Sequence, residues 1–533
     1  MASKAETSSV FVRNSTGLVR ELSGWDVFVM NTIGTNPMGN YAVLFTLGLA
    51  VFVGANLWLS TLTGIFIGIS IVVLYGLFAA AMPRSGGDYV YVSRVLHPSV
   101  GFIISWLMLF TVAFYVGYNG WAFAAWIIPD IVGVFGQWIG APFLVSIATA
   151  LPQTLWVVIV GIVGLGLYYL ICSKGLRAVM RWQQVAFGLA VLSFLVAIPM
   201  MLAAPAGSFV SNFNTFAAHY GTSASQVLAI AHKNGYTGVG TFSWGSTFGF
   251  WPFVMEMTGY AIISIPMGGE VRNAKRTQIR GIFWANAIGG LIVAIFFLVT
   301  ALKENANLAG AIGYFNYING AHSPFPFPIY SQVLAGIITN SPWVALLVGL
   351  GVFFGIFAAG LTLALWATRY LFAWSFDRLA PSYLADIHEK SHSPRNALIV
   401  TMIVSWIFTL LLTFDVNFTF VSVGLLEIVL FIIVSIAGIV LPYKMKDLYN
   451  ATIKGEVLGI PNIVLAAVIS LIFNLVMAYY YLTNGAYGAT SSISWEFVSV
   501  LLGTGILFYL GRLWQLKKQG IDVNLAFREI PPE

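Results

Sequence analysis

Residues 34–40 read Gly-Thr-Asn-Pro-Met-Gly-Asn, and they interrupt an apolar run that extends from residue 25 to residue 53. Proline lacks a backbone N–H and glycine weakens a helix, so a helix across this run is expected to break here. At about 1.5 Å per residue, the break lies near the middle of a hydrocarbon layer about 30 Å thick. The stretch therefore predicts a membrane-spanning helix that is interrupted halfway.

The rest of the chain has the composition of a membrane protein. Apolar residues make up 59% of the 533 residues and charged residues 8%, whereas about a quarter of the residues in soluble domains are charged. The runs are continuously apolar, which indicates helices rather than the alternating strands of a barrel. Twelve such runs are long enough to span a bilayer, at residues 25–53, 57–82, 100–128, 155–172, 183–204, 244–268, 282–302, 342–374, 397–414, 418–443, 461–482 and 494–513.

The basic residues orient these twelve spans. With a cytoplasmic amino terminus, 23 of the 25 Lys and Arg residues fall on the cytoplasmic side, all except Lys233 and Lys303. A wrong helix count would invert the later loops and destroy this asymmetry, so the positive-inside rule supports both the count and the orientation. The sequence predicts a multi-pass protein of the plasma membrane, embedded in the lipid bilayer, with both termini in the cytoplasm.

A second interruption matches the first. The sixth span contains Met257, Thr258, Gly259 and Tyr260 at a similar depth, and it enters the membrane from the opposite side. Paired breaks in helices one and six are typical of two inverted five-helix repeats. The predicted fold is therefore all-α, with twelve transmembrane helices, a 5+5 inverted repeat, broken helices 1 and 6, and two further C-terminal helices. The expected segments are a cytoplasmic tail at 1–24, a first repeat at 25–204, an extracellular loop at 205–243, a second repeat at 244–443, helices 11 and 12 at 461–513, and a cytoplasmic tail at 514–533.

Non-helical backbone at this depth is tolerated only where protein or a wet cavity satisfies its polar groups, so the two breaks predict one binding place. Helix amino ends suit an anionic group, and exposed carbonyl groups suit an amine or a cation. A proline kink packed against neighbouring helices is the alternative. The predicted substrate-binding residues are Gly34, Thr35, Asn36, Pro37, Met38, Gly39, Glu256, Met257, Thr258, Gly259 and Tyr260.

Three segments between the spans carry recognisable motifs. Residues 83–89 read Pro-Arg-Ser-Gly-Gly-Asp-Tyr, residues 268–276 read Gly-Gly-Glu-Val-Arg-Asn-Ala-Lys-Arg, and residues 377–381 read Asp-Arg-Leu-Ala-Pro. In order and spacing they resemble the signatures of the amino acid, polyamine and organocation transporter superfamily. The resemblance implies the inverted-repeat fold and the movement of amino acids or related amines by alternating access.

The resemblance also implies a gate on the cytoplasmic side, where Glu270 would form an ionic latch with a nearby arginine; the candidates are Arg84 and Arg272. An ion pair without a gating role is the alternative. The first break departs from the family pattern, because residues 36–40 do not reproduce its second glycine pair. Neither the helix-five lysine nor the helix-eight hydroxyl pair used by some relatives is evident, so the coupling ion stays open.

Two carboxylates lie inside the predicted spans. Glu256 and Glu427 are each about 15 Å from the outer end of their helix, where a charge is costly unless it faces a cavity or a partner. Both are candidates for proton coupling, and Glu256 is also a candidate contact for a substrate amine. On helix three, Tyr115, Tyr118 and Asn119 are candidate pathway residues or simply packing residues.

The predicted function is a secondary active transporter of an amino acid or related amine, with a coupling proton as a candidate partner. A transporter of an inorganic ion or a nucleobase, a channel, and a ligand sensor without transport are the alternatives. We expect no enzyme activity, no catalytic residue, no cofactor and no metal, because no nucleophile-base or metal-ligand spacing lies in the spans. We expect no nucleic-acid partner either, since membrane topology explains the +6 charge.

Overall fold

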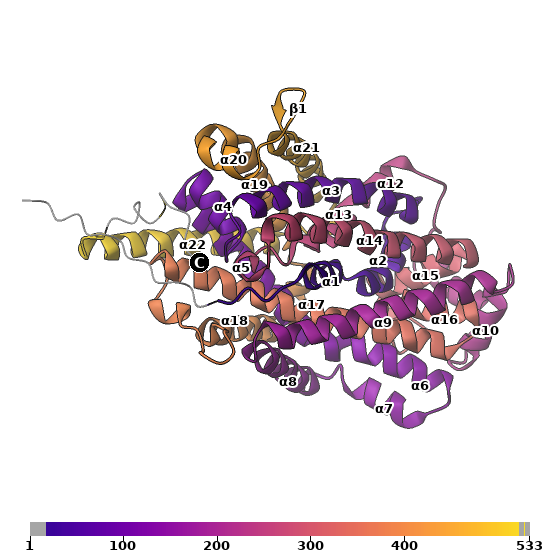
Figure 1. Ribbon diagram of the computed structural model, residues 1–533. Helices are drawn as coiled ribbons and strands as arrows, with labels where there is room; N and C mark the ends of the chain where they lie inside the picture. Colours follow the sequence, from indigo (N-terminus) through magenta and orange to yellow (C-terminus); the bar gives the residue numbers. More distant parts are fainter. Residues whose placement is uncertain (1–17, 522–526, 528–533) are drawn as a thin grey trace, which may run out of the picture.

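The computed structural model describes residues 18–521 and Phe527, so most of the predicted tails at 1–24 and 514–533 lies outside the described residues. Within this part the chain is almost entirely α-helical, with one two-stranded hairpin formed by β1 (Glu456–Val457) and β2 (Ile460–Pro461). Most long helices run roughly parallel (Figure 1). Residue 18 and the end of the last helix lie at the same end of the bundle, at the left in Figure 1; we call this end the termini side.

Ten helices in the described part are long and apolar enough to cross a membrane. They are α3 (Leu57–Ala81), α5 (Pro98–Ala122) with its continuation to Trp138, α8 (Thr154–Ser173), α9 (Leu176–Ala203), α14 (Ala274–Lys303), α17 (Pro342–Phe376), α18 (Arg395–Phe414), α19 (Gly424–Lys444), α21 (Asn462–Thr483) and α22 (Ser492–Lys518).

The two predicted spans missing from this set are the two that were expected to be broken. Helix one consists of α1 (Gly24–Gly34) and α2 (Pro37–Val51), and the membrane-spanning helix six consists of α12 (Trp244–Gly249) and α13 (Trp251–Gly259). Each piece alone is too short to cross about 30 Å of hydrocarbon. The ten continuous spans and the two broken ones confirm the prediction of twelve.

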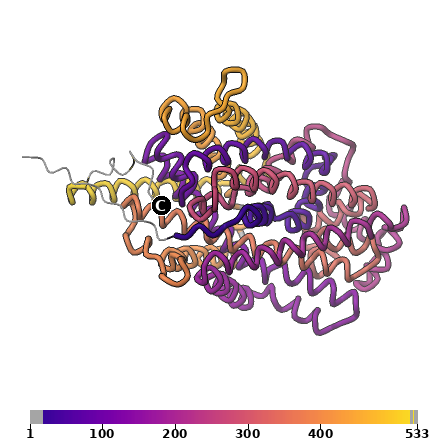
Figure 2. Tube along the Cα trace, in the orientation of Figure 1, coloured from indigo at the N-terminus to yellow at the C-terminus, as the bar shows by residue number. Residues whose placement is uncertain are grey.

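Helix packing follows the order expected of two repeated halves. Span 2 packs on span 7 (α3 on α14), span 5 on span 8 (α9 on α17), and span 3 on span 10 (α5 on α19). In a 5+5 repeat each span corresponds to the span five places away among the first ten. Spans 5 and 8 therefore correspond to spans 10 and 3, which is the third pair, and spans 2 and 7 correspond to each other. The broken first span runs through the middle of this bundle, as the indigo segment of Figure 2 shows.

Several helix ends differ from the predicted ends. Span 5 begins at Leu176 rather than residue 183, and span 7 begins at Ala274 rather than residue 282. Span 3 contains the π-helical turn η1 (Phe123–Ile127) and continues beyond residue 128 through a second one, η2 (Pro129–Gly133), into α6 (Val134–Trp138). The predicted ends followed hydropathy, whereas backbone hydrogen bonding continues into the polar flanks.

The two long loops opposite the termini side contain helices. Residues 205–243 form α10 (Phe209–Ala218) and α11 (Ala224–Lys233), and residues 303–341 include α15 (Ala306–Tyr317) and α16 (Ser331–Thr339). The second loop is fixed to α2: Tyr317 Oη donates to the Val43 carbonyl at 2.8 Å, and Ser331 Oγ donates to the Ala42 carbonyl at 3.0 Å. It therefore covers the outer half of helix one.

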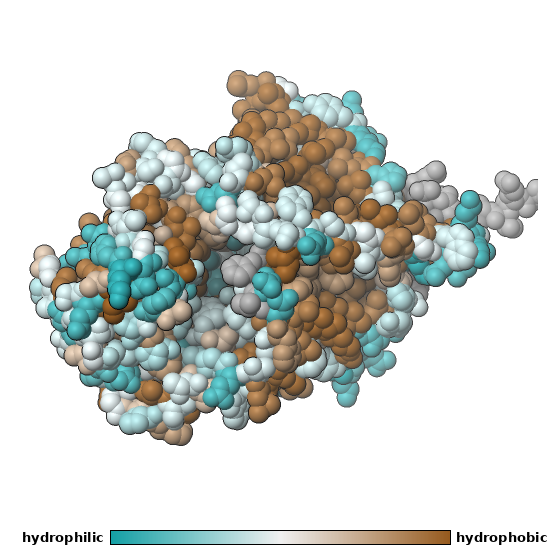
Figure 3. All heavy atoms as spheres, turned by 180° about the vertical axis from the view of Figure 1, so that it is seen from behind, coloured by the Kyte–Doolittle hydropathy of each residue, from teal (hydrophilic) through white to brown (hydrophobic). Residues whose placement is uncertain are grey.

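The remaining elements connect the spans. They are the helices α4 (Asp88–Val95), α7 (Pro142–Ala150) and α20 (Lys446–Thr452), and the 3-10 turns η3 (Tyr260–Ile262), η4 (Gly268–Glu270), η5 (Gly320–His322), η6 (Ser382–Ala385), η7 (Val416–Phe420) and η8 (Gly485–Tyr487). Large apolar side chains on α8, α9, α18, α21 and α22 are exposed. Seen from behind, the molecule presents a broad apolar surface (Figure 3), as expected of a surface that faces lipid.

Close helix contact at Gly117 gives a test of this packing. A Cβ at Gly117 on α5 would lie 2.3 Å from the Ser405 carbonyl oxygen on α18, and backbone cannot move aside easily. We expect Gly117→Ala to lower the free energy of unfolding by about 1–3 kcal/mol, measured by thermal unfolding in detergent. Gly166→Ala on α8 is the matched control, because a Cβ there has no neighbour within 4 Å. Equal melting temperatures for the two variants would contradict this packing.

Candidate functional site

The first break is short and stabilised by local hydrogen bonds. The helix α1 ends at Gly34, α2 begins at Pro37, and Asn36 between them has a left-handed backbone with φ 41°. Asn40 Nδ2 donates to the Thr35 carbonyl oxygen at 2.7 Å. The interruption predicted over residues 34–40 therefore comprises two non-helical residues; Gly34 ends α1, and residues 37–40 form the first turn of α2.

The sequence explains this geometry. Proline disfavours an α conformation in the residue before it and is well suited to the first position of a helix. Asparagine tolerates the left-handed region better than most residues do. The first backbone hydrogen bond of α2 runs from Asn40 N–H to the Asn36 carbonyl at 2.9 Å, so the amides of Met38 and Gly39 precede the helical ladder.

The second break has a different form. The helix α13 ends at Gly259 and is followed by the turn η3, and the next α-helix begins only at Ala274. Ser264 satisfies part of this irregular backbone: its N–H donates to Asn31 Oδ1 at 3.0 Å, and its hydroxyl donates to Gln278 Oε1 at 2.8 Å. Asn31 Nδ2 donates to Ser264 Oγ at 2.8 Å. The break in helix six is thus fastened to both helix one and helix seven.

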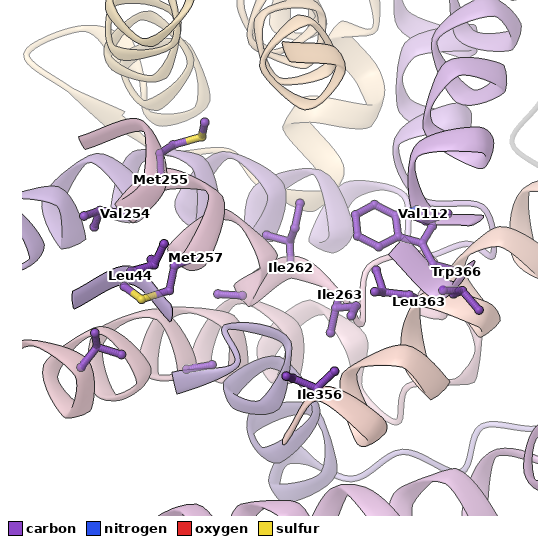
Figure 4. Close-up of a cluster of buried hydrophobic side chains, with 14 of the residues drawn as sticks. Leu44, Val112, Val254, Met255, Met257, Ile262, Ile263, Ile356, Leu363 and Trp366 are labelled. Carbon is purple, nitrogen blue, oxygen red and sulfur yellow. The ribbon is translucent and has the colours of Figure 1, made fainter. Parts of the chain in front are cut away.

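The two breaks meet at Gly34. A Cβ at this position would lie 2.6 Å from the Tyr260 carbonyl oxygen, so only glycine permits this approach. Beside the contact is a cavity of about 330 Å³. Its lining residues are Gly34, Asn36, Gly39, Asn40, Val43, Leu44, Leu47, Tyr115, Tyr118, Asn119, Trp126, Phe253, Glu256, Met257, Tyr260, Ile263, Ile356, Ala359 and Leu363. Figure 4 shows Leu44, Met257, Ile263 and Ile356 converging from different elements.

Six of the eleven predicted substrate-binding residues line this cavity, namely Gly34, Asn36, Gly39, Glu256, Met257 and Tyr260. The other five are buried beside it: Thr35, Pro37, Met38, Thr258 and Gly259. Met38 packs against Gly351 of α17, and the Thr258 hydroxyl donates to the Val254 carbonyl at 2.9 Å. These five residues shape the breaks but do not line the cavity.

The candidate pathway residues of helix three, Tyr115, Tyr118 and Asn119, all line the cavity. Trp126 was not predicted, and it lies in the π-helical turn η1 of the same span. A π-helical turn changes which face of the helix a side chain occupies, so regular helical spacing could not have placed it.

The two membrane carboxylates each accept a hydrogen bond from a tyrosine. Glu256 accepts from Tyr481 Oη on α21, and Glu427 accepts from Tyr260 Oη. The two carboxylates are near enough for their charges to interact. Tyr481 was not predicted, because α21 lies outside the two repeats and no local pattern distinguishes this tyrosine from its neighbours Tyr479 and Tyr480. Glu427 does not line the cavity itself but reaches it through Tyr260.

The profile of the amino acid permease family matches residues 22–507. The chain belongs to this family. The permease is therefore a membrane protein that transports amino acids as a secondary transporter. It is also similar to the branched-chain amino acid permease BcaP of Bacillus subtilis (strain 168), with 25% identity over 466 residues that cover 86% of this chain and 88% of that protein.

On the termini side of the permease, Glu270 has an arginine partner, but neither sequence candidate is that partner. Arg369 on α17 donates to both oxygens of Glu270 at 2.8 and 2.9 Å, and both side chains are buried. Arg84 Nη1 donates to the Pro83 carbonyl, and Arg272 Nε donates to the Arg20 carbonyl. The partner was missed because it comes from a helix a hundred residues away in sequence.

A second buried ion pair lies nearby. Arg94 on α4 contacts both oxygens of Asp377 at 2.8 and 2.7 Å, and Tyr89 Oη donates to the same carboxylate at 2.7 Å. The backbone of Leu22 pairs with residues 270–272, with N–H to the Glu270 carbonyl at 2.9 Å. These contacts join the start of helix one, the segment after helix six, α4 and α17 on the termini side.

Asp88 in the motif at residues 83–89 is buried outside the spans. It accepts hydrogen bonds from Tyr370 Oη at 2.7 Å and from the Tyr89 N–H at 2.9 Å. Burial raises the pKa of the Asp88 carboxyl to about 7, although these hydrogen bonds oppose the rise. Its side chain therefore carries a proton in the folded permease at pH values where an exposed aspartate has lost it.

This pKa gives stability a defined pH dependence. Between about pH 4 and pH 7 the folded state holds a proton that the unfolded chain has released, so stability falls as the pH rises and levels off above pH 7. The fall amounts to about 4 kcal/mol at most. We expect Asp88→Asn to flatten this slope in unfolding measurements from pH 4 to 8. Asp386→Asn, which changes an exposed carboxylate on the same side, should retain it, and an unchanged slope in Asp88→Asn would refute the assignment.

Proposed function

We propose that the permease carries amino acids with apolar side chains by alternating access around the cavity between the two breaks. The observation that supports this most directly is the cavity wall, which is formed mainly by apolar and aromatic side chains, including Val43, Leu44, Leu47, Phe253 and Ile356. No Lys, Arg or His is among its lining residues. The similar Bacillus protein is named for branched-chain amino acids, which fits such a wall.

The common part of an amino acid would bind at the broken helices. In this proposal its carboxylate lies near the amino end of α2, where the amide of Gly39 and the helix dipole favour an anion. Its ammonium group lies near Glu256 and Asn36 Oδ1, a buried oxygen that has no hydrogen-bond partner within the described part of the chain. Gly34, Met257 and Tyr260 complete the proposed contact set.

We also propose that transport is coupled to protons through Glu256 and Glu427. The two carboxylates interact electrostatically inside the bundle, and each accepts a hydrogen bond from a neutral tyrosine hydroxyl. Two negative charges at this depth are costly, so a proton or the substrate ammonium group is needed to offset one of them. A site that exchanges a proton for a substrate charge is suited to coupling.

We place the permease in the plasma membrane with both termini in the cytoplasm, so that the termini side is the cytoplasmic side. The distribution of basic residues supports this orientation. Lys303, one of the two exceptions, donates to the Leu202 and Ala204 carbonyls at the opposite end of the bundle. We propose no enzymatic role and no nucleic-acid partner, because the basic residues follow topology.

Thermal shift with purified permease tests the substrate class. Leucine, isoleucine and valine are expected to raise the melting temperature, since a ligand at 100 times its Kd stabilises the folded state by about 2.7 kcal/mol. Gly34→Ala should abolish this shift, because the added Cβ would clash with the Tyr260 carbonyl oxygen and force the two breaks apart. A shift caused by lysine, glutamate, simple amines or nucleobases, with none from apolar amino acids, would overturn the proposal.

Substitution of Glu256 tests coupling. In proteoliposomes, Glu256→Gln should remove the dependence of uptake on external pH and abolish accumulation against a gradient, because the neutral amide cannot exchange a proton. Should Glu256 bind the substrate ammonium group instead, the KM would rise about tenfold or more while the pH dependence persisted. The matched control is Glu496→Gln, which changes an exposed carboxylate at the start of α22. Unchanged affinity together with unchanged pH dependence would exclude both roles.

A further inference from the structure

The loop between α19 and α21 ends in a small β-hairpin with an unusual turn. Val457 on β1 pairs with Ile460 on β2, so the connecting loop consists of Leu458 and Gly459. Both loop residues have positive φ, 52° and 76°, as in the two-residue turns that normally favour Asn-Gly. A leucine at such a position is strained, because its Cβ is too close to the backbone in the left-handed region.

The same leucine is the most exposed large apolar residue in the described part of the chain. Leu458 is 97% exposed, and its neighbours Val457 and Ile460 are 49% and 45% exposed. The hairpin thus presents three apolar side chains at a tip that packing within the permease does not cover. Backbone strain and exposure together indicate that the tip is selected for contact with something outside the chain.

The direction of the hairpin is fixed at its base. Tyr449 on α20 is buried, its Oη donates to the Gly455 carbonyl at 2.8 Å, and the Asn462 N–H donates to the same carbonyl at 2.9 Å. Figure 1 shows the hairpin, labelled β1, projecting sideways from the bundle rather than along the direction of the long helices. The tip therefore points outward in the plane in which a membrane would lie.

The apolar tip is continuous with the surface that faces lipid. In Figure 3 the apolar surface of the hairpin, at the top, merges with the apolar surface of the spans below it. On α21, which follows the hairpin directly, Leu465, Ile469 and Ile472 are exposed. This continuity favours the bilayer over a separate protein as the occupant.

We propose that the hairpin at residues 456–461 is an anchor inserted into the bilayer leaflet on the termini side. Val457, Leu458 and Ile460 contact acyl chains, while the exposed Lys446 and Lys454 lie at the level of the lipid phosphates. Insertion is shallow, because the turn has backbone groups that must remain near water. Glu456 at the base of the hairpin is exposed and lies on the aqueous side.

The anchor acts on two helices of the site. The hairpin connects α19, which carries Glu427, to α21, which carries Tyr481. A hairpin held in the leaflet fixes the loop between these helices relative to the membrane while the rest of the bundle moves. This inference is independent of the substrate and of proton coupling.

Depth-dependent fluorescence quenching tests the anchor. In a Cys172→Ala background, which removes the single native cysteine, bimane is attached to Leu458→Cys, and the full-length permease is placed in phosphatidylglycerol nanodiscs with brominated acyl chains. Ile472→Cys on the exposed face of α21 is the lipid control, and Lys390→Cys in the exposed loop before α18 is the aqueous control. Quenching at Leu458→Cys is expected to be within about twofold of the lipid control. Quenching no greater than at Lys390→Cys would overturn the proposal.

A second variant separates turn geometry from insertion. Leu458→Asn suits the left-handed turn better than leucine does, so the hairpin should still form. For this test bimane is attached to Val457→Cys, and quenching by the brominated acyl chains is compared with and without Leu458→Asn. If the hairpin is an anchor, Leu458→Asn should reduce the quenching at least twofold without lowering the melting temperature. Unchanged quenching would show that leucine has no role in insertion and would also overturn the proposal.

Discussion

The structure depends on one constraint: backbone N–H and C=O groups inside a bilayer need partners from the protein itself or from a wet cavity. Continuous helices meet this requirement automatically, and two spans do not. At the first break Asn40 supplies a side-chain donor to the Thr35 carbonyl, and at the second Ser264 is held between Asn31 and Gln278. The cavity lies next to these contacts, so the position of the proposed substrate site follows from how the backbone at the breaks is satisfied.

Two pairs of buried acidic residues in the permease differ in their partners. On the termini side, Glu270 and Asp377 are paired with Arg369 and Arg94, which neutralises them and fixes the packing of helices six, eight and the α4 segment. Beside the cavity, Glu256 and Glu427 accept from tyrosine hydroxyls, which are neutral. An arginine partner makes a carboxylate a permanent structural ion, whereas a tyrosine partner leaves its charge free to change. This difference agrees with the proposed coupling role of Glu256 and Glu427 and with a packing role for Glu270 and Asp377.

The candidate site was predicted in part. Composition and proline-glycine positions located both breaks, and six of the proposed contact residues line the cavity. The partners were not predicted: Tyr481 comes from a helix outside the repeats, and Arg369 rather than Arg84 or Arg272 pairs with Glu270. These contacts join residues 225 and 99 positions apart, and no local pattern encodes such a separation.

By itself, the sequence determined the twelve spans, the two interruptions and the family, because hydropathy, helix-breaking residues and short motifs are local properties of the chain. Only the tertiary structure decided which members of the segment 34–40 line the cavity and which, like Met38, pack against a neighbouring helix. It also decided that the break comprises Thr35 and Asn36 alone. The physical reason is that the direction of a side chain depends on how helices pack and on where their backbone hydrogen bonds resume, and both are settled between segments distant in sequence.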